Sequence, residues 1–253
     1  MWHKIKNIAL LIALVVFSSG CIKMEHYLTF KEDGTATYRL KYSISEQAIV
    51  QFRTMEKLKG QLAEAAGEPP PGIEMEPLFH LFLDPDEATL REAISKYESQ
   101  GIILKKLESK VVSSWRNIEI KLEINDLEKA ANSDLFKAHG FNLTQDNNGN
   151  YVFYREPHIK RPGEITKVPT EEELKQLIPI VAGFNTTVRI KVPGNIKSTT
   201  AFDNSRNRAS WIFDFDREPG SIQALQRQAF RVVFAAPETR FPEMKYNGSQ
   251  ITE

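Results

Sequence analysis

The stretch YLTFKEDGTATYRLKY, residues 27–42, decides the fold. Its centre, Asp33-Gly34, adopts the positive backbone φ of a tight turn at little cost, which favours a β-hairpin. The flanking residues are rich in β-branched and aromatic side chains, which are common in strands. The second flank alternates apolar and charged residues, which is the period of a strand whose two faces meet different surroundings. We therefore expect a sheet with one buried face and one hydrated face.

The same alternation recurs along the chain. In residues 115–124, Ile118, Ile120 and Leu122 alternate with charged residues, which indicates a half-exposed antiparallel strand. Residues 146–149 supply a second tight turn between two short apolar runs. We expect further strands over residues 78–83, 102–112, 115–124, 141–144, 151–154, 187–192, 210–215 and 230–234.

Three segments carry the three- and four-residue apolar spacing of amphipathic helices. The first starts at a capping box formed by Ser43 and Glu46 and extends to about residue 66. The second spans about residues 84–100, and the third starts at Thr170. The expected fold class is therefore α+β, with antiparallel, half-exposed sheets of β-hairpins packed by about three amphipathic helices.

The N-terminus has the three-part layout of a secretory signal peptide. Lys4 and Lys6 precede the apolar run of residues 8–17, and small residues fill positions 18–20. A helical run of this length is about 15 Å long, which is only half of the roughly 30 Å hydrocarbon core of a bilayer. We therefore expect residues 1–20 to be a signal peptide that is removed on export, and not a permanent membrane span.

Cys21 decides how that signal is processed. Ser19, Gly20 and Cys21 resemble the last three positions of a lipobox, in which the cysteine thiol accepts a diacylglyceryl group, while Ser18 stands where the pattern prefers Leu. Cleavage by the ordinary signal peptidase is the alternative, since Ser18 and Gly20 also satisfy its small-x-small rule. Cys21 is the only cysteine of the sequence and so has no intramolecular disulfide partner. Lipidation of Cys21 is the expected outcome.

A lipidated Cys21 determines where the protein lies. Two or more acyl chains anchor a protein stably, whereas a single chain holds it only marginally. The next residue is Ile22 and not Asp, which under the enterobacterial sorting rule directs a lipoprotein to the inner leaflet of the outer membrane. We therefore expect an exported protein of the cell envelope, held close to its membrane because the first strand begins soon after Cys21.

Composition limits the partners and the size of the core. The chain has 33 basic and 33 acidic residues, and loss of Lys4 and Lys6 with the signal peptide leaves a formal charge of −2. This balance creates no overall field that favours nucleic acid. The length allows one large core or two small ones. We expect an N-terminal part over residues 21–162 and a C-terminal part over 163–236, packed as one unit, followed by a polar tail over 237–253.

The residue types that bind metals or catalyse reactions form no recognisable motif. His26, His80, His139 and His158 lack the spacing of metal ligands. Residues 146–150 are rich in oxygen ligands but do not follow the calcium-loop pattern, so a hairpin turn is favoured. The sequence contains no serine elbow, phosphate-binding glycine loop or dinucleotide fingerprint. We therefore predict no metal, no cofactor and no catalytic residue.

Two further clusters have both a functional and a structural interpretation. Asp214 and Asp216 project to the same face of a strand and could act as paired carboxylates, or they form its hydrated side opposite Trp211. The basic residues between His158 and Lys167 could contact anionic lipid head groups, or they belong to a solvated linker. We favour the structural interpretation in both cases.

Two separated stretches carry a family resemblance. The first is the strand-turn-strand of residues 28–37, and the second is Val-Pro-Gly-Asn-Ile at 192–196, followed by Thr199 and Thr200 and by Trp211 on the next strand. Together they resemble the LppM-like bacterial lipoproteins, in which a Pro-Gly-x-Ile or Pro-Gly-x-Val turn precedes a strand bearing Trp. An Asn-Gly turn after Thr200 is absent from this sequence. The resemblance implies the fold and a location in the cell envelope, and it implies no catalytic residues.

These observations lead to a functional hypothesis and two alternatives. We expect a lipid-anchored bacterial envelope lipoprotein, a non-catalytic module that binds an envelope protein or an apolar or lipidic ligand between sheet and helices. A purely structural or assembly lipoprotein is one alternative. The other is an envelope hydrolase with a spatially assembled site, which requires a pocket that joins His26, His80 or His139 to a serine and a carboxylate.

Overall fold

The structure is a computed structural model that describes residues 22–50, 54, 87–137, 141–157, 185–214, 217–218 and 221–242. The expected signal peptide, Cys21, the strand over 78–83 and the helix from Thr170 lie outside these residues, as does nearly all of the first helix beyond residue 50. None of the helices in the described ranges has the length and apolar character of a membrane span.

The first hairpin forms as its turn predicts. Strands β1 (Ile22–Phe30) and β2 (Ala36–Ser45) are antiparallel along their full lengths. Gly34 has a φ of +82°, the left-handed conformation that this turn requires. The Asp33 carboxylate accepts hydrogen bonds from the backbone N–H and the hydroxyl of Thr35, at 2.9 and 2.6 Å. The turn therefore satisfies its own polar groups.

This hairpin is the centre of a seven-stranded sheet with the order β3-β4-β2-β1-β7-β10-β9. The other five strands of this sheet are β3 (Ile102–Val112), β4 (Trp115–Ile124), β7 (Asn185–Lys191), β9 (Asp203–Ser205) and β10 (Arg208–Asp214). Every pair is antiparallel except β1 with β7, which is parallel. The expectation of purely antiparallel sheets is therefore wrong at this pair. Residues 31–184 separate β1 from β7 in the sequence, which leaves ample length for the crossover that a parallel pair requires.

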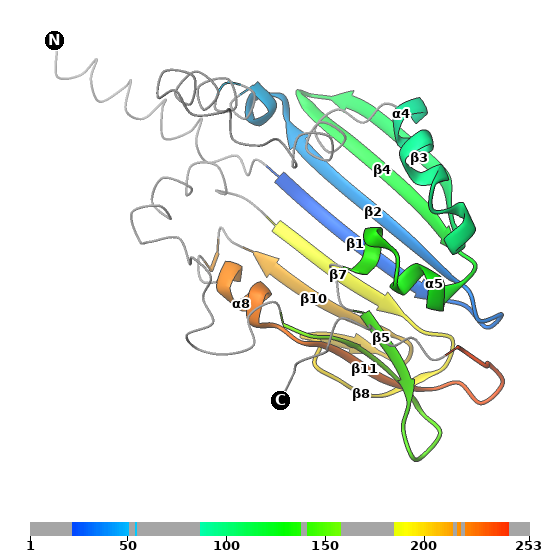
Figure 1. The fold of residues 1–253 in the computed structure, drawn as a ribbon. Helices are drawn as coiled ribbons and strands as arrows, with labels where there is room; N and C mark the ends of the chain where they lie inside the picture. Colours follow the sequence, from blue (N-terminus) through cyan, green and yellow to red (C-terminus); the bar gives the residue numbers. More distant parts are fainter. Residues whose placement is uncertain are drawn as a thin grey trace, which may run out of the picture.

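A four-stranded antiparallel sheet lies beside the larger one, with the order β5-β6-β11-β8 (Figure 1). It consists of β5 (Phe141–Gln145), β6 (Tyr151–Arg155), β8 (Asn195–Thr199) and β11 (Phe230–Ala235). The short strands β8 and β9 are additions to the strands expected from sequence. Both sheets combine strands from residues 21–162 and 163–236, so neither part forms a sheet of its own.

Helices contribute less to the described residues than the expected α+β class implies, and the fold is mostly β. Besides the helical residues 46–50, they are α4 (Glu87–Ser95), η1 (Glu98–Gln100), α5 (Leu127–Ala131), α6 (Asp134–Lys137) and α8 (Ser221–Arg227). α4 lies within the helix expected over about 84–100 and buries Leu90 and Ile94. The capping box expected at Ser43 is not formed, because β2 continues through Ser43 to Ser45 and the helix starts only at Glu46. Ser45 is its cap, since its hydroxyl accepts the Ala48 N–H at 3.1 Å.

The core lies between the inner face of the large sheet, the small sheet and the short helices. Trp211, on β10, is fully buried, and its indole N–H donates to the backbone oxygen of Thr200 at 3.0 Å. Residues 237–242, the first of the expected polar tail, contribute to this core, whereas residues 243–253 lie outside the described residues. Phe241 is buried, and the Tyr151 hydroxyl accepts its N–H and donates to the backbone oxygen of Thr239.

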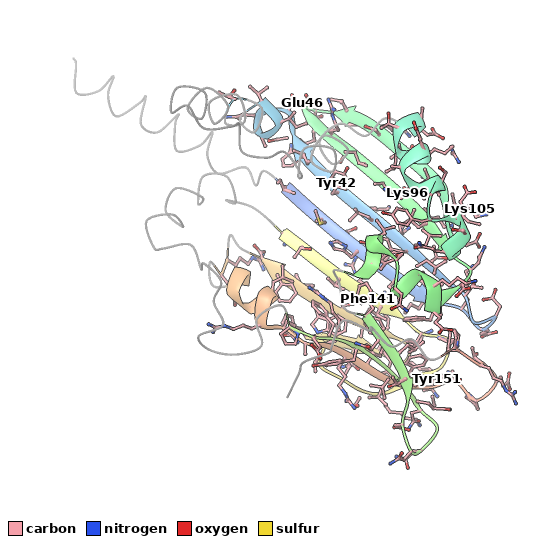
Figure 2. All side chains as sticks on the ribbon, in the orientation of Figure 1. Tyr42, Glu46, Lys96, Lys105, Phe141 and Tyr151 are labelled. Carbon is pink, nitrogen blue, oxygen red and sulfur yellow. The ribbon has the colours of Figure 1, made fainter. Side chains whose placement is uncertain are left out.

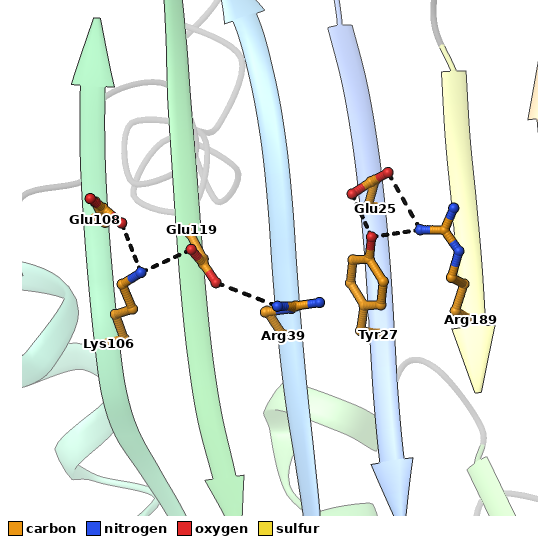
Figure 3. Close-up of polar contacts among 7 residues, drawn as sticks. All are labelled: Glu25, Tyr27, Arg39, Lys106, Glu108, Glu119 and Arg189. Carbon is orange, nitrogen blue, oxygen red and sulfur yellow. Dashed lines mark hydrogen bonds and ion pairs between the residues drawn. The ribbon is translucent and has the colours of Figure 1, made fainter. Parts of the chain in front are cut away.

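The outer face of the large sheet carries the charged residues of the alternating pattern (Figure 3). Lys106 donates to Glu108 and Glu119 at 2.7 and 2.9 Å. On β1 and β7, the Tyr27 hydroxyl donates to Glu25 at 2.7 Å and accepts from Arg189 at 2.5 Å. Because these pairs are half-exposed, water screens them, and each contributes little to stability. They form a hydrated face, as the alternation predicts.

Candidate ligand pocket between the sheets

An apolar pocket of about 290 Å³ lies between the two sheets. Strands β1, β2 and β7 form one wall, β5, β6 and β11 form the other, and α5, α6 and α8 contribute the remaining lining. Apolar side chains from several of these elements line it, including Met24, Leu28, Phe141, Val188, Leu225 and Phe230. Phe141, which Figure 2 labels, is the first residue of β5 and one of the lining residues.

The period of β1 explains how the chain builds this pocket. Alternate residues of a strand share a face, so Met24, His26, Leu28 and Phe30 all lie on the inner side. The register places Val188 of β7 opposite His26, on the same face. The α5 residues Ala130 and Ala131, which have small side chains, also line the pocket. Larger residues there would occupy the space, so the alanines help to keep it open.

His26 and Tyr38 form a hydrogen-bonded pair in this apolar lining. The His26 Nδ1 lies 2.6 Å from the Tyr38 hydroxyl oxygen. Burial raises the pKa of the Tyr38 phenol, so the phenol stays protonated and is able to donate to an unprotonated Nδ1. The Tyr38 ring also makes an edge contact with Phe136, at 5.8 Å between ring centroids. The pair gives the pocket a fixed polar point.

Arg155, at the end of β6, brings a charge to the pocket. Its guanidinium lies over the ring of Phe230, 4.9 Å from the centroid. Burial lowers the pKa of the Arg155 guanidinium, but arginine remains protonated in proteins near neutral pH. Among the described residues that line the pocket, Arg155 is the only one with a permanent charge. The pocket thus combines apolar walls with a cation and a histidine-tyrosine pair.

Only one of the four candidate histidines lies among the described residues. His26 lines the pocket, whereas His80, His139 and His158 lie outside the described residues, as does Cys21. The other polar residues of the described lining are Tyr38, Thr186 and Arg155, so His26 meets neither a serine nor a carboxylate there. The constellation that the hydrolase alternative requires is not assembled among these residues.

Asp216 and the basic residues from His158 to Lys167 lie outside the described residues, and the other candidate residues have structural roles. The Asp146 carboxylate accepts the backbone N–H groups of Asn148 and Asn150, at 2.9 and 2.8 Å, which confirms the hairpin turn. Asp214 accepts from Arg217 beyond the end of β10 and lies opposite buried Trp211 in the strand's alternation. Within the described ranges, no three His, Cys, Asp or Glu side chains are grouped closely enough to hold a metal ion.

Sequence reasoning missed Arg155 and Tyr38 as site residues, although a signal for both was present. Tyr38 belongs to the apolar series of β2, and Arg155 continues the inward series of Tyr151 and Phe153 on β6. An arginine at an inward-facing position needs a partner or a ligand near it, because burying a charge alone is costly. That argument could have identified Arg155 from the alternation alone.

Comparison with known proteins gives one informative result. No protein-family model matches the sequence, and no curated protein matches it. Among solved structures, the chain is similar to the NMR structure of the folded domain of LppM from Mycobacterium tuberculosis. The match covers 88% of this chain and 92% of that chain, with 9% sequence identity and a TM-score of 0.38. That structure is of a protein of the family that the sequence resembles, and the match assigns no role to any residue of this chain.

Proposed function

We propose that this chain is a lipid-anchored, non-catalytic module of the bacterial cell envelope that binds an apolar ligand in the pocket between its sheets. The observation that supports the ligand is the pocket itself, with its apolar walls and its few fixed polar groups. Ligand sites in proteins have this composition, in which the polar groups orient a ligand that the apolar walls hold. The anchor rests on the sequence around Cys21.

The size of the pocket limits the ligand class. Its volume of about 290 Å³ is near the lower end of the roughly 300–1,000 Å³ range of small-molecule sites. It is larger than an engineered cavity of about 150 Å³ that binds benzene. A hydrocarbon chain or a small ring system with one polar end fits this description. Arg155 and His26 are the groups that would meet the polar end.

Binding of a neutral apolar probe tests the proposal. The probe is N-phenyl-1-naphthylamine, whose fluorescence increases in apolar surroundings, added to the complete lipoprotein in detergent micelles below probe saturation. Ala131→Phe places a ring in the pocket and is expected to weaken binding at least about tenfold, since each 1.4 kcal/mol of lost interaction is a factor of ten. Ala131→Ser changes the same residue without filling the pocket and serves as the matched control.

A second variant separates blocked binding from misfolding. Leu28→Phe fills the pocket from the opposite wall, and both filled variants must retain the circular dichroism of the parent. Equal probe binding by the parent and by both folded variants would overturn the proposed site. Mass spectrometry of the lipoprotein purified from membranes identifies any natural ligand. Loss of that ligand in Ala131→Phe would assign it to this pocket.

A further inference from the structure

The β3–β4 turn lies at the same end of the large sheet as the start of β1. The pairing register sets Ile22 opposite Ile44, Ile44 opposite Arg116 and Arg116 opposite Val111. These residues form one row across four neighbouring strands. The next row outward contains Trp115 and Val112, which pair with each other. Figure 1 shows the start of β1, the end of β2 and this turn at one end of the sheet.

The anchor fixes the position of this row relative to a membrane. Cys21 is bonded to Ile22, so their Cα atoms are about 3.8 Å apart. Three strand spacings of about 4.8 Å separate β1 from β3, so the turn lies roughly 14 Å sideways from the anchor. Along the strand direction, the turn extends at least as far as Cys21. A bilayer that holds the lipid on Cys21 is therefore within reach of the turn.

The side chains at this end are unusually apolar for a hairpin turn. Val111 and Val112 are each 58% exposed. The other exposed large hydrophobic side chains of the described residues are Val50, Phe202 and Ile212. Exposed apolar residues that gather at one place indicate a contact surface, whereas scattered ones do not.

Trp115 and Lys23 complete an arrangement that suits a membrane surface. The Lys23 ammonium lies 5.8 Å from the centre of the half-buried Trp115 ring. Tryptophan favours the level of the lipid head groups, and lysine directs its ammonium there from an apolar surface. Both preferences suit a turn that lies at a membrane surface. If the turn faced only water, its two exposed valines would have no such role.

The turn is also held in place. Ser113 and Ser114 have φ of 50° and 63°, the left-handed pair of a two-residue hairpin turn. The backbone oxygen of Ser114 accepts the Glu46 N–H at 2.9 Å, which joins the turn to the start of the helix after β2. Figure 2 labels Glu46 at this end of the molecule. The valines are therefore presented on a positioned loop.

We propose that the β3–β4 turn inserts Val111 and Val112 into the surface of the bilayer that holds Cys21, with Trp115 and Lys23 at the level of the head groups. This inference rests on the lipid anchor of the proposed function and is independent of the pocket. The turn then fixes the orientation of the domain, because a single lipidated residue leaves it free to rotate about the anchor. Two separated contacts restrict that rotation.

Spin labelling of the complete lipoprotein in vesicles tests this contact. In the lipidated protein the Cys21 sulfur is a thioether, so Ser113→Cys introduces the only free thiol. Asn148→Cys is the matched control, since Asn148 is exposed on the β5–β6 turn, at the other end of the molecule (Figure 1). Nitroxide labels are attached at each position, and the protein is reconstituted in phosphatidylcholine vesicles with one quarter phosphatidylglycerol.

We expect the label at position 113 to be more accessible to oxygen than to a water-soluble nickel chelate, and the label at 148 to show the reverse. Intact mass is measured on the same sample. If Cys21 carries lipid and both labels are equally exposed to the chelate, the membrane contact is overturned while the anchor stands. If the mass shows an unmodified Cys21, the anchor fails and this inference fails with it.

Trp115 provides a second measurement without a label. In the chain without residues 1–20 the other tryptophan is Trp211, which is fully buried, so vesicles with brominated lipids should quench only Trp115. Replacing Val111 and Val112 with Ser is expected to abolish this quenching. Phe202→Ser, at another exposed hydrophobic residue, should leave it unchanged. Burial of the turn only in native membranes, and not in pure lipid vesicles, would identify a protein partner and overturn the proposal.

Discussion

Gly194 is the described glycine whose surroundings leave least room for a side chain, beside the pairing of β8 with β11 in the small sheet. It precedes β8, and a Cβ placed on it would lie 1.6 Å from the backbone oxygen and 2.7 Å from the carbonyl carbon of Ala235, the last residue of β11. Real side chains do not tolerate such distances, and both atoms belong to backbone. For Gly194→Ala to fold, β8 and β11 must separate at this point. Their pairing of Asn195 with Ala235 would then be lost or displaced.

The expected cost follows from this geometry. Overpacking usually costs about 1–3 kcal/mol, and a clash between backbone and a new Cβ belongs to the upper end of that range. Replacing glycine also stabilises by about 0.4–1 kcal/mol through the unfolded chain, which offsets only a part. We expect a net loss of about 2–3 kcal/mol, which for a domain of this size lowers the thermal midpoint by roughly 4–12 °C.

Urea and thermal unfolding followed by circular dichroism measure this loss. Gly149→Ala is the matched control, because Gly149 has a φ of +77° but its Cβ would meet only the end of the Gln145 side chain, at 3.7 Å. The control should lose about 1 kcal/mol through its left-handed backbone alone. A Gly194→Ala protein that is as stable as the control, or more so, would refute the close approach of β8 to β11.

Three further predictions concern the anchor, the core and the charged face. Cys21→Ser should abolish incorporation of radioactive fatty acid and leave the protein released or as precursor; labelling that persists would disprove lipidation at Cys21. Trp211→Ala should cost about 3–5 kcal/mol in urea unfolding, because it empties a fully buried site, whereas Phe202→Ala, at an exposed aromatic, should cost less than about 1 kcal/mol. The Lys106 ammonium is the main cause that lowers the pKa of Glu108 from 4.5 to about 2, so Lys106→Met should raise that pKa, though to less than 4.5 because Lys110 remains. A lowered carboxyl pKa stabilises the fold above pH 4.5, and this stabilisation is lost as the pH falls towards 2. The difference in urea midpoint between the parent and Lys106→Met should therefore shrink over that range. NMR of the Glu108 carboxyl carbon measures the pKa directly.

The parts of the fold that could be predicted from sequence are those determined by neighbouring residues. Strands expected over 102–112 and 115–124 match β3 and β4 residue for residue, because alternation and a short turn act locally. The parallel pairing of β1 with β7 was not predicted, since it joins residues 162 positions apart, such as Lys23 and Asn185, and leaves no local pattern. β8 and β9 were missed for a different reason. They are short, mostly exposed strands whose side chains carry almost no apolar period.

For the candidate site too, local patterns predict some residues, whereas others depend on the tertiary structure. His26 was noticed because it alternates on β1, and its structural interpretation is compatible with its bond to Tyr38. The pocket itself depends on the tertiary arrangement, since it needs the small residues of α5 opposite the apolar series of β1. Arg155 is the last residue of β6, one position beyond the strand expected over 151–154, and the ring that it covers, Phe230, comes from the neighbouring strand β11. This contact depends on the pairing of two strands that are distant in sequence, so no local pattern predicts it.

The positions of the pocket and the anchor along β1 connect the two proposals. Met24 is the lining residue nearest the start of the strand, about 7 Å from Ile22 at roughly 3.4 Å per residue. The lining then continues along β1 through Leu28 to Phe30, so the pocket extends away from the anchored end. If the β3–β4 turn holds that end against the bilayer, an apolar ligand reaches Met24 directly from the membrane, without crossing water. Ligand exchange with vesicles should then be slower in the variant with Ser at positions 111 and 112, although its affinity for N-phenyl-1-naphthylamine in micelles is unchanged. Equal exchange rates in the two proteins would separate the membrane contact from the function of the pocket.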